Sequence, residues 1–272
     1  MKVLVVGSGG REHTLCWALS RSPRVETLRC APGNAGIAGH AERVAIAAED
    51  IDGLTRHAVE EGYDLVVVGP EAPLVEGLAD RLHEAGIAVF GPSAEAARLE
   101  GSKAHSKEFM ARHGVPTAAF RVFDEFAAIE SHLRDPGTAY PLVLKADGLA
   151  AGKGVLIVDD VEAAVDGARS MLVDRAFGDA GRRVVVEACP RGTEASFLEL
   201  GDGERFGELA TCQDTPRARD GDPGPNTGGM GPSSPSAYLD TRLRDRIVTE
   251  IVRPTIDGLA AEGAPYRGVL FR

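Results

Sequence analysis

The feature that most constrains the fold is the alternation of short apolar runs with helix-length segments over residues 1–100. The apolar runs are rich in valine, leucine and isoleucine and lie at Lys2–Val6, Val25–Cys30, Asp64–Val68 and Ile87–Phe90. Continuous apolar strands joined by helices are typical of a parallel sheet that is buried on both faces. We therefore expect residues 1–100 to form an α/β domain with a doubly wound parallel sheet.

The pattern changes after Glu100. Predicted strands at Leu142–Lys145 and Val155–Val158 flank a glycine-rich hairpin, and further strands follow without helices between them. Such a succession predicts an antiparallel sheet, so residues 101–272 are expected to form an α+β domain. The segment 210–237 is rich in proline, glycine, aspartate and asparagine, and a loop of that length is expected to carry a function.

Composition excludes several classes of partner. The chain has 272 residues, and 41 acidic against 30 basic side chains give a net charge of −11. A nucleic-acid binder needs a dense basic face to release phosphate counterions, so no nucleic-acid partner is expected. No apolar run approaches the roughly 20 residues that span a bilayer, so no membrane partner is expected either.

The cysteines and the first residues predict a cytoplasmic location. The 4 cysteines lie far apart without a CxxC pair, and the opening MKVLVVG is too short for a signal peptide. We expect a monomer or a weak homo-oligomer in a reducing compartment.

A glycine-rich turn at residues 7–10 follows the first predicted strand and precedes a helix. Glycines there let the backbone approach a phosphate at the helix N-terminus. The dinucleotide fingerprint has a third glycine at its sixth position, where this chain has Glu12, so a nicotinamide site is disfavoured. A tight turn without a ligand and a site for another phosphate-bearing ligand both remain open.

A second loop, Gly69–Leu74, follows another strand of the same predicted sheet. Ligands of open α/β sheets bind beyond the carboxyl ends of the strands, and Glu71 can accept a hydrogen bond from an amine or a sugar hydroxyl. The alternative is a rigid turn, stiffened by Pro70 and Pro73, with a solvated glutamate.

The segment KADGLAAGKGV at 145–155 is more specific. A glycine hairpin that carries two lysines can fold over a polyphosphate, with N–H groups and ammonium charges opposite the phosphate oxygens. It is not a P-loop, because Lys153 is followed by Gly154 and not by serine or threonine. The alternative is a solvated β-hairpin.

The segment DPGPNTGGMG at 222–231 is the other strong motif. Asparagine and threonine beside glycines offer side-chain donors and exposed backbone N–H groups, which suit a carboxylate or a phosphate. The histidines show no metal-ligand spacing, and the sequence offers no Ser/His/Asp or Cys/His arrangement for nucleophilic catalysis.

Taken in order, these motifs resemble one family over the whole chain. The matching segments are GSGGREH at 7–13, APGNAG at 31–36, VVGPEAPLV at 67–75, GPS at 91–93, GSKAHSK at 101–107, KADGLAAGKGV at 145–155 and GPNTGGMG at 224–231. They resemble the phosphoribosylamine–glycine ligases, also called glycinamide ribonucleotide synthetases, which are ATP-grasp enzymes of purine biosynthesis. The resemblance implies a truncated ATP-grasp domain over residues 101–272, with a nucleotide-lid subdomain at 118–190.

The resemblance also implies an activity: ligation of glycine to 5-phosphoribosylamine through a glycyl phosphate, which consumes ATP. In that case the nucleotide contacts are Lys103, Lys145, Gly148, Gly152, Lys153, Gly154, Glu187 and Glu194. The reacting groups lie near Asp214, Asn226, Thr227, Gly228 and Gly229. The contacts to 5-phosphoribosylamine are Gly9, Gly10, Gly69, Pro70 and Glu71. The family uses Mg²⁺ or Mn²⁺, whose ligands are expected outside this chain because they belong to a segment that follows Arg272.

Two departures from the family pattern leave a second hypothesis open. The adenine hinge, usually Glu-Glu-Phe-Leu, is Glu-Ala-Cys-Pro at 187–190, and Pro190 has no N–H to donate to adenine. The family's Gln-Asp-His-Lys-Arg is here Gln-Asp-Thr-Pro-Arg at 213–217, which loses an imidazole and a cation. The alternative to a ligase is therefore a catalytically incomplete protein that binds a nucleotide or a sugar phosphate.

Overall fold

The computed structural model describes residues 1–149, 154–215, 218–220, 227 and 230–271. The chain divides into two compact units. The first comprises Met1–Arg98, Leu200–Phe206 and Leu259–Leu270, and the second comprises Leu99–Glu199, Gly207–Gly258 and the chain end.

The first unit is built on a five-stranded parallel sheet with the order β3-β2-β1-β4-β5. Its strands are β1 (Lys2–Gly7), β2 (Thr27–Pro32), β3 (Glu42–Arg43), β4 (Leu65–Val68) and β5 (Ala88–Phe90). The central strand β1 pairs through Val5 with Cys30 of β2 and with Val67 of β4. The sequence predicted this parallel sheet. Its strand order reverses between the neighbouring strands β1 and β4, so the switch point lies at their carboxyl ends, where Gly7 ends β1 and Gly69 follows β4.

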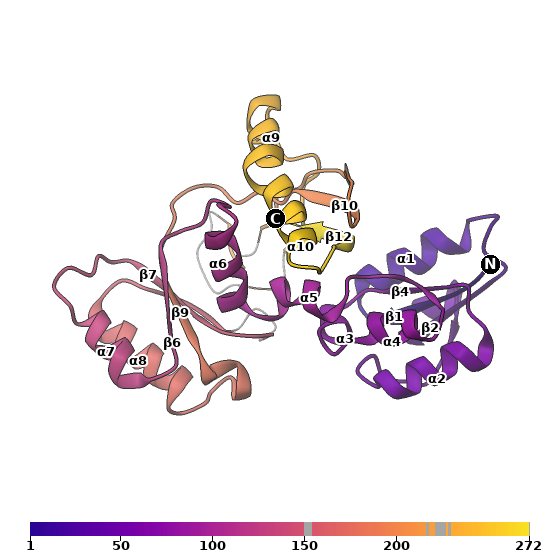
Figure 1. Cartoon of the computed structure of the whole chain (residues 1–272), viewed down its shortest axis with the longest axis horizontal. Coiled ribbons are helices and arrows are strands. Elements are labelled where there is room, and N and C mark those ends of the chain that lie inside the picture. The colour runs from indigo at the N-terminus through magenta and orange to yellow at the C-terminus, as the bar shows by residue number, and fades with distance from the viewer. Residues whose placement is uncertain (150–153, 216–217, 221–226, 228–229, 272) are drawn as a thin grey trace. The chain divides into compact units, whose positions relative to one another are not determined.

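Helices cover both faces of this sheet (Figure 1). They are α1 (Gly10–Ser20), α2 (Ile51–Glu61), α3 (Glu71–Val75) and α4 (Leu78–Glu84). Helix α5 (Ala94–Gly101) follows and continues into the second unit. Leu4 and Val6 face one core with Leu54 of α2 and Leu82 of α4. Val3 and Val5 face the other core, which holds Cys16 of α1 and Cys30. Alternate residues of a strand point to opposite faces, so a strand buried on both sides must be apolar throughout.

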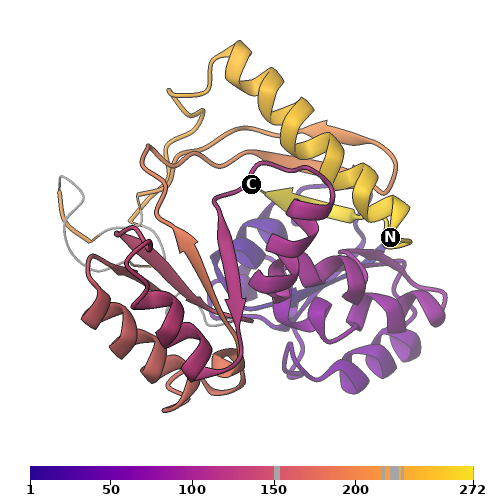
Figure 2. The ribbon, with the colours of Figure 1, turned by 60° about the vertical axis from the view of Figure 1, so that its left-hand side comes forward.

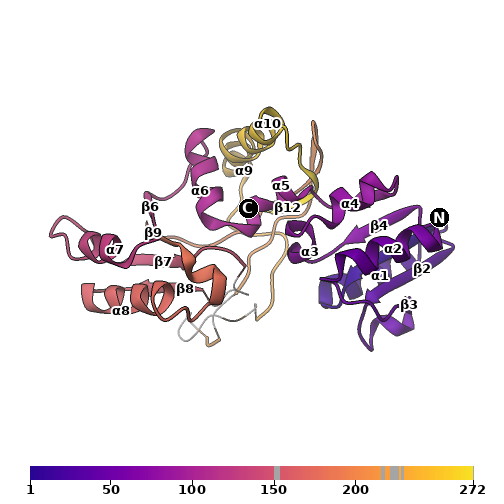
Figure 3. The ribbon, with the colours of Figure 1, turned by 60° about the horizontal axis from the view of Figure 1, so that its bottom comes forward.

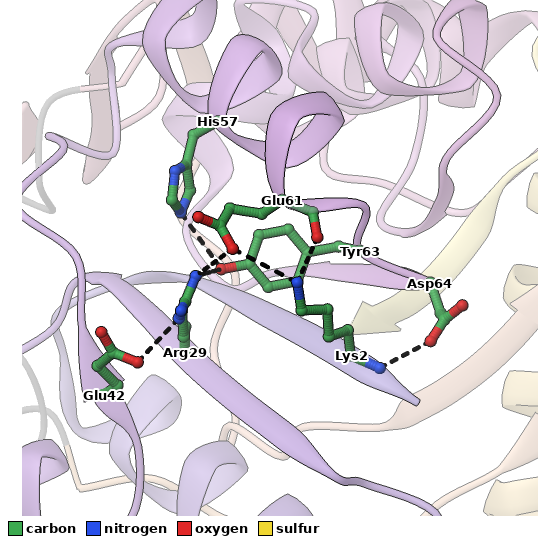
Figure 4. Close-up of polar contacts among 7 residues, drawn as sticks. All are labelled: Lys2, Arg29, Glu42, His57, Glu61, Tyr63 and Asp64. Carbon is green, nitrogen blue, oxygen red and sulfur yellow. Dashed lines mark hydrogen bonds and ion pairs between the residues drawn. The ribbon is translucent and has the colours of Figure 1, made fainter.

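A polar cluster lies beside β2, the strand next to the short β3 (Figure 4). Arg29 of β2 donates to Glu42 Oε2 at 2.9 Å and contacts Glu61 Oε2 at 2.7 Å and the hydroxyl of Tyr63 at 3.4 Å. His57 Nε2 lies 3.2 Å from the same hydroxyl. Tyr63 is buried, and this burial raises its pKa. A buried hydroxyl without partners is costly, so we interpret the cluster as structural: Arg29 and His57 supply hydrogen-bond partners to the hydroxyl of Tyr63.

The second unit contains a four-stranded antiparallel sheet with the order β6-β9-β7-β8, as the sequence predicted. The strands are β6 (Phe120–Phe123), β7 (Leu142–Ala146), β8 (Val155–Val158) and β9 (Val184–Ala188). Helices α7 (Phe126–Leu133) and α8 (Val161–Leu172) pack on one face and form a core with Leu144 and Val186 (Figure 3). Lys145 and Glu187 stand one residue further along their strands and therefore point to the other face, where α6 (Lys103–Arg112) contacts β9.

The remaining elements are a three-stranded sheet of order β11-β10-β12 and a helical segment. The strands are β10 (Leu198–Asp202), β11 (Phe206–Glu208) and β12 (Arg267–Phe271). Helices α9 (Thr241–Ile247) and α10 (Arg253–Ala261) are joined by a π-helical stretch at Val248–Val252, and Figure 2 shows them as one rod. The sequence predicted this rod as a single helix. In the part of the chain that the structure describes, no helix is long and apolar enough to cross a membrane.

Candidate functional site

The carboxyl ends of β1 and β4 are shaped by the side chain of Glu12. This carboxylate is only 4% exposed and accepts a hydrogen bond from the N–H of Gly9 at 2.6 Å. A Cβ at Gly69 would lie 2.0 Å from Glu12 Oε1, and a Cβ at Gly7 would lie 2.6 Å from Glu12 Cγ. Gly7 also has a φ of +128°, which a side chain disfavours. These two glycines therefore make room for a carboxylate, and the pyrophosphate of a dinucleotide would meet that negative charge.

The sequence left a ligand-binding loop and a rigid turn open for Gly69–Leu74, and in the structure helix α3 begins within this segment, at Glu71. Pro73 is compatible with this helix since the first four N–H groups of a helix have no partner within it. Arg11 donates to the carbonyl of Gly69 at 2.5 Å and ties the loop to the first turn of α1. The structure thus brings Gly9, Gly10, Gly69, Pro70 and Glu71 to the edge where the strand order reverses.

In the second unit, Asp147 joins the N-terminus of α6 to the end of β7. Its carboxylate, 8% exposed, accepts hydrogen bonds from the hydroxyl of Ser102 at 2.9 Å, from the N–H of Ala104 at 3.1 Å and from Arg183 at 2.5 Å. Ser102 is in turn the N-cap of α6 and accepts from the N–H of His105. The arrangement fixes the direction in which α6 leaves this corner.

Lys103 is the first residue of α6, and its ammonium group donates to the carbonyl of Gly148 at 2.7 Å. Burial lowers the pKa of Lys103, and the positive charge of Lys145 acts in the same direction, while Asp147 opposes it. The two lysines that the sequence predicted as phosphate contacts therefore lie near enough to repel each other. An anion between them would be stabilised by both charges.

A second carboxylate, Glu187 at the end of β9, contacts two lysines. Its Oε1 forms an ion pair with Lys145 of β7 and its Oε2 forms one with Lys107 of α6. Glu187 is 3% exposed, so the pairing takes place away from water. The following residues include Pro190, and the backbone N–H of Ala188 is already bonded to the carbonyl of Ala119 at 3.0 Å.

The other predicted residues are placed only in part. Gly154 accepts a hydrogen bond from the N–H of Ala146 at 2.8 Å, which closes the base of the hairpin. Glu194 is exposed, and Asp214 is half-buried and accepts from the N–H of Thr215 at 2.8 Å. Thr227 is exposed. Gly152, Lys153, Asn226, Gly228 and Gly229 lie outside the described residues, so the structure says nothing of them.

Some residues of this corner were missed by the sequence predictions, namely Ser102, Lys107, Asp147 and Arg183. One signal for Lys107 was present, since residues four apart share a helix face and Lys103 and Lys107 have that spacing. The partners of Lys107 and Asp147 lie far away in the sequence. Within the described ranges, no group of three or more histidine, cysteine, aspartate or glutamate side chains could hold a metal ion.

The family comparisons match both parts of the chain. The model described as "Phosphoribosylglycinamide synthetase, N domain" matches residues 1–100, and the one described as "Phosphoribosylglycinamide synthetase, ATP-grasp (A) domain" matches residues 101–272. The phosphoribosylamine–glycine ligases of Xanthomonas axonopodis pv. citri and Allochromatium vinosum are 51% and 52% identical over 273 aligned positions, which cover 100% of this chain. The chain spans 63% of the length of each of these relatives.

The solved structures agree with this assignment. The crystal structure of phosphoribosylamine–glycine ligase from Thermotoga maritima has a TM-score of 0.85 and 31% sequence identity, and the match covers 100% of this chain and 64% of that one. A biotin carboxylase from Campylobacter jejuni, with a TM-score of 0.75 at 19% identity over 99% of this chain and 61% of its own, shares the fold. The chain therefore belongs to the phosphoribosylglycinamide synthetase family.

Proposed function

We propose that this protein serves the ATP-dependent ligation of glycine to 5-phosphoribosylamine, which yields glycinamide ribonucleotide, ADP and phosphate, in the purine biosynthesis of the cytoplasm. The observation that carries this proposal is the identity of about half of all positions, along the entire chain, with relatives that are named for this ligation. Two matched segments, 1–100 and 101–272, are proposed as the domains, with 118–190 as the nucleotide-lid subdomain.

The corner formed by α6, β7 and β9 suits the nucleotide. Lys103 and Lys145 supply positive charge against its phosphates, and Glu187 stands at the start of the hinge that would meet its adenine. ATP supplies the phosphoryl group that makes the carboxylate of glycine reactive towards an amine. Gly148 and Gly154 mark the two ends of the hairpin that we assign to the lid, and Glu194 is proposed to hold the ribose.

The amine substrate is assigned to the first unit. The edge formed by Gly9, Gly10, Gly69, Pro70 and Glu71 is proposed to bind 5-phosphoribosylamine, because ligands of such sheets bind where the strand order reverses. Asp214 and Thr227, with the segment around them, are proposed to lie near the reacting groups.

Mg²⁺ or Mn²⁺ is expected for the family, but the described residues offer no set of ligands that fits such an ion. We therefore assign no step of the reaction to a metal held by this part of the chain.

The test is release of ADP that depends on both glycine and 5-phosphoribosylamine. Replacing Lys145 with methionine should lower this release at least about a hundredfold, since a charge that stabilises the transferring phosphoryl group contributes several kcal/mol. Arg246→Met is the matched control, because Arg246 of α9 forms an exposed ion pair with Glu250. Tight binding of ATP without substrate-dependent ADP release would instead favour the binding-protein alternative that Pro190 suggests.

A further inference from the structure

Helix α6 presents two lysines one turn apart, and they have different surroundings. Lys103 reaches the carbonyl of Gly148, whereas Lys107 is turned towards the sheet and is only 9% exposed. The ammonium group of Lys107 donates to the hydroxyl of Thr117 at 2.7 Å and lies 5.9 Å from the centre of the Phe120 ring. It also forms the ion pair with Glu187 Oε2. Lys107 is therefore held inside the unit and does not face solvent.

Glu187 divides its two oxygens between two lysines. Oε2 is taken by Lys107, whose side chain is 11% exposed, and Oε1 is taken by Lys145, whose side chain is 29% exposed. Two ammonium groups thus share one carboxylate, and the three side chains carry a net charge of +1. Since an uncompensated charge is costly away from water, a further anion would stabilise this group. Lys145, the more exposed lysine, is the one that an anion can reach.

Lys107 determines how much of the charge of Lys145 is left over. While Lys107 pairs with Oε2 of Glu187, only Oε1 pairs with Lys145, so the charge of Lys145 is only partly neutralised. Without Lys107, the whole carboxylate would pair with Lys145, and the pair would be neutral. A phosphate would then compete with Glu187 for the same ammonium group.

We propose that Lys107 is a positioning residue for a nucleoside polyphosphate: by holding Glu187, it keeps the ammonium group of Lys145 available to the phosphates without touching them. This inference rests on the nucleotide site of the proposed function. Lys107 should therefore affect the binding of the phosphates and not the binding of adenine.

The test compares ATP, ADP and adenosine by calorimetry with the full chain. Lys107→Met should weaken binding of ATP and ADP about tenfold or more, because Glu187 then pairs fully with Lys145 and weakens the charge-assisted contact of Lys145 with the phosphates. Adenosine binding should change less than about twofold. Lys107→Arg, which keeps the charge, should restore most of the ATP affinity. Arg246→Met, at the exposed pair, should change none of the three affinities.

A double variant separates positioning from damage to the fold. If Glu187 neutralises Lys145 once Lys107 is gone, then Lys107→Met combined with Glu187→Gln should recover the ratio of ATP to adenosine affinity. A parallel loss of adenosine and ATP binding in Lys107→Met, or a double variant with a ratio no better than that of the single variant, would overturn the inference. If the unaltered protein binds neither ATP nor ADP, it is the proposed nucleotide site that fails.

Discussion

At the residue scale, the side chain of Glu12 explains why glycine occupies positions 7 and 69. Gly7 and Gly69 approach the Glu12 carboxylate so closely that any Cβ would collide with it. Gly69→Ala must push Glu12 away from the N–H of Gly9, and we expect it to lower the free energy of unfolding by about 1–3 kcal/mol. Gly39→Ala is the control, because a Cβ there meets nothing within 4 Å. Equal urea midpoints for the two variants would contradict this account.

Lys103 gives a pH dependence whose sign is set by burial. Its lowered pKa means that, as the pH rises, the ammonium form is lost below the ordinary value of 10.5. The folded state then binds fewer protons than the unfolded state in that window, so this group alone makes stability rise with pH. Nucleotide affinity should do the opposite and fall, because the phosphates lose a cation. Lys103→Arg should flatten this fall on the alkaline side of neutrality, because an arginine keeps its charge there. An unchanged slope in Lys103→Arg would assign the effect to another group.

At the element scale, helix α6 depends on a carboxylate that belongs to another element. Asp147 accepts from Ala104 at the first turn of α6 and from Arg183 beside β9, and both bonds are buried or partly buried. Asp147→Asn should therefore cost about 1.5–3 kcal/mol, as expected when charged hydrogen bonds are lost. Asp160→Asn, at the exposed N-cap of α8, should be nearly neutral because asparagine caps as well as aspartate. Urea unfolding measures the loss in each variant, and an equally small loss for Asp147→Asn would show that the negative charge of Asp147 contributes little.

The elements also show which features a sequence can predict. The parallel sheet was predictable because strands such as β1 and β4 are apolar on both faces, and this signal is local. The short helix α3 was missed because Pro70 and Pro73 are ordinary turn residues, although the first turn of a helix accepts proline. Of the candidate site, the lysines in recognisable motifs were predicted. The ion pair of Lys107 with Glu187 was not, because it is created by the packing of α6 against β9, and the spacing of Lys103 and Lys107 does not identify Glu187 as the partner.

At the scale of the whole molecule, the protein has a negative net charge, and two of its proposed substrates, ATP and 5-phosphoribosylamine, carry negatively charged phosphates. The net charge of −11 repels them at long range, so their binding must depend on small groups of cations such as Lys103 and Lys145. The chain also has separate cores, with Leu4 and Leu54 in the first unit and Leu144 and Val186 in the second. Each proposed site therefore belongs to a unit that has its own hydrophobic core.

This separation predicts that the two sites can be lost one at a time. Gly9→Val places a Cβ 3.0 Å from Glu12 Oε2, and it should weaken binding of ribose 5-phosphate to the first unit at least about tenfold while ATP binding stays within about threefold. Lys145→Met should show the reverse, because its partner Glu187 belongs to the second unit. Calorimetry with each ligand alone measures both effects, and equal binding of ribose 5-phosphate by Gly9→Val and the unaltered protein would exclude the proposed sugar-phosphate site. Loss of both ligands in either variant would show that the sites are coupled by more than about 1 kcal/mol, and the separate cores could not then account for the molecule's behaviour.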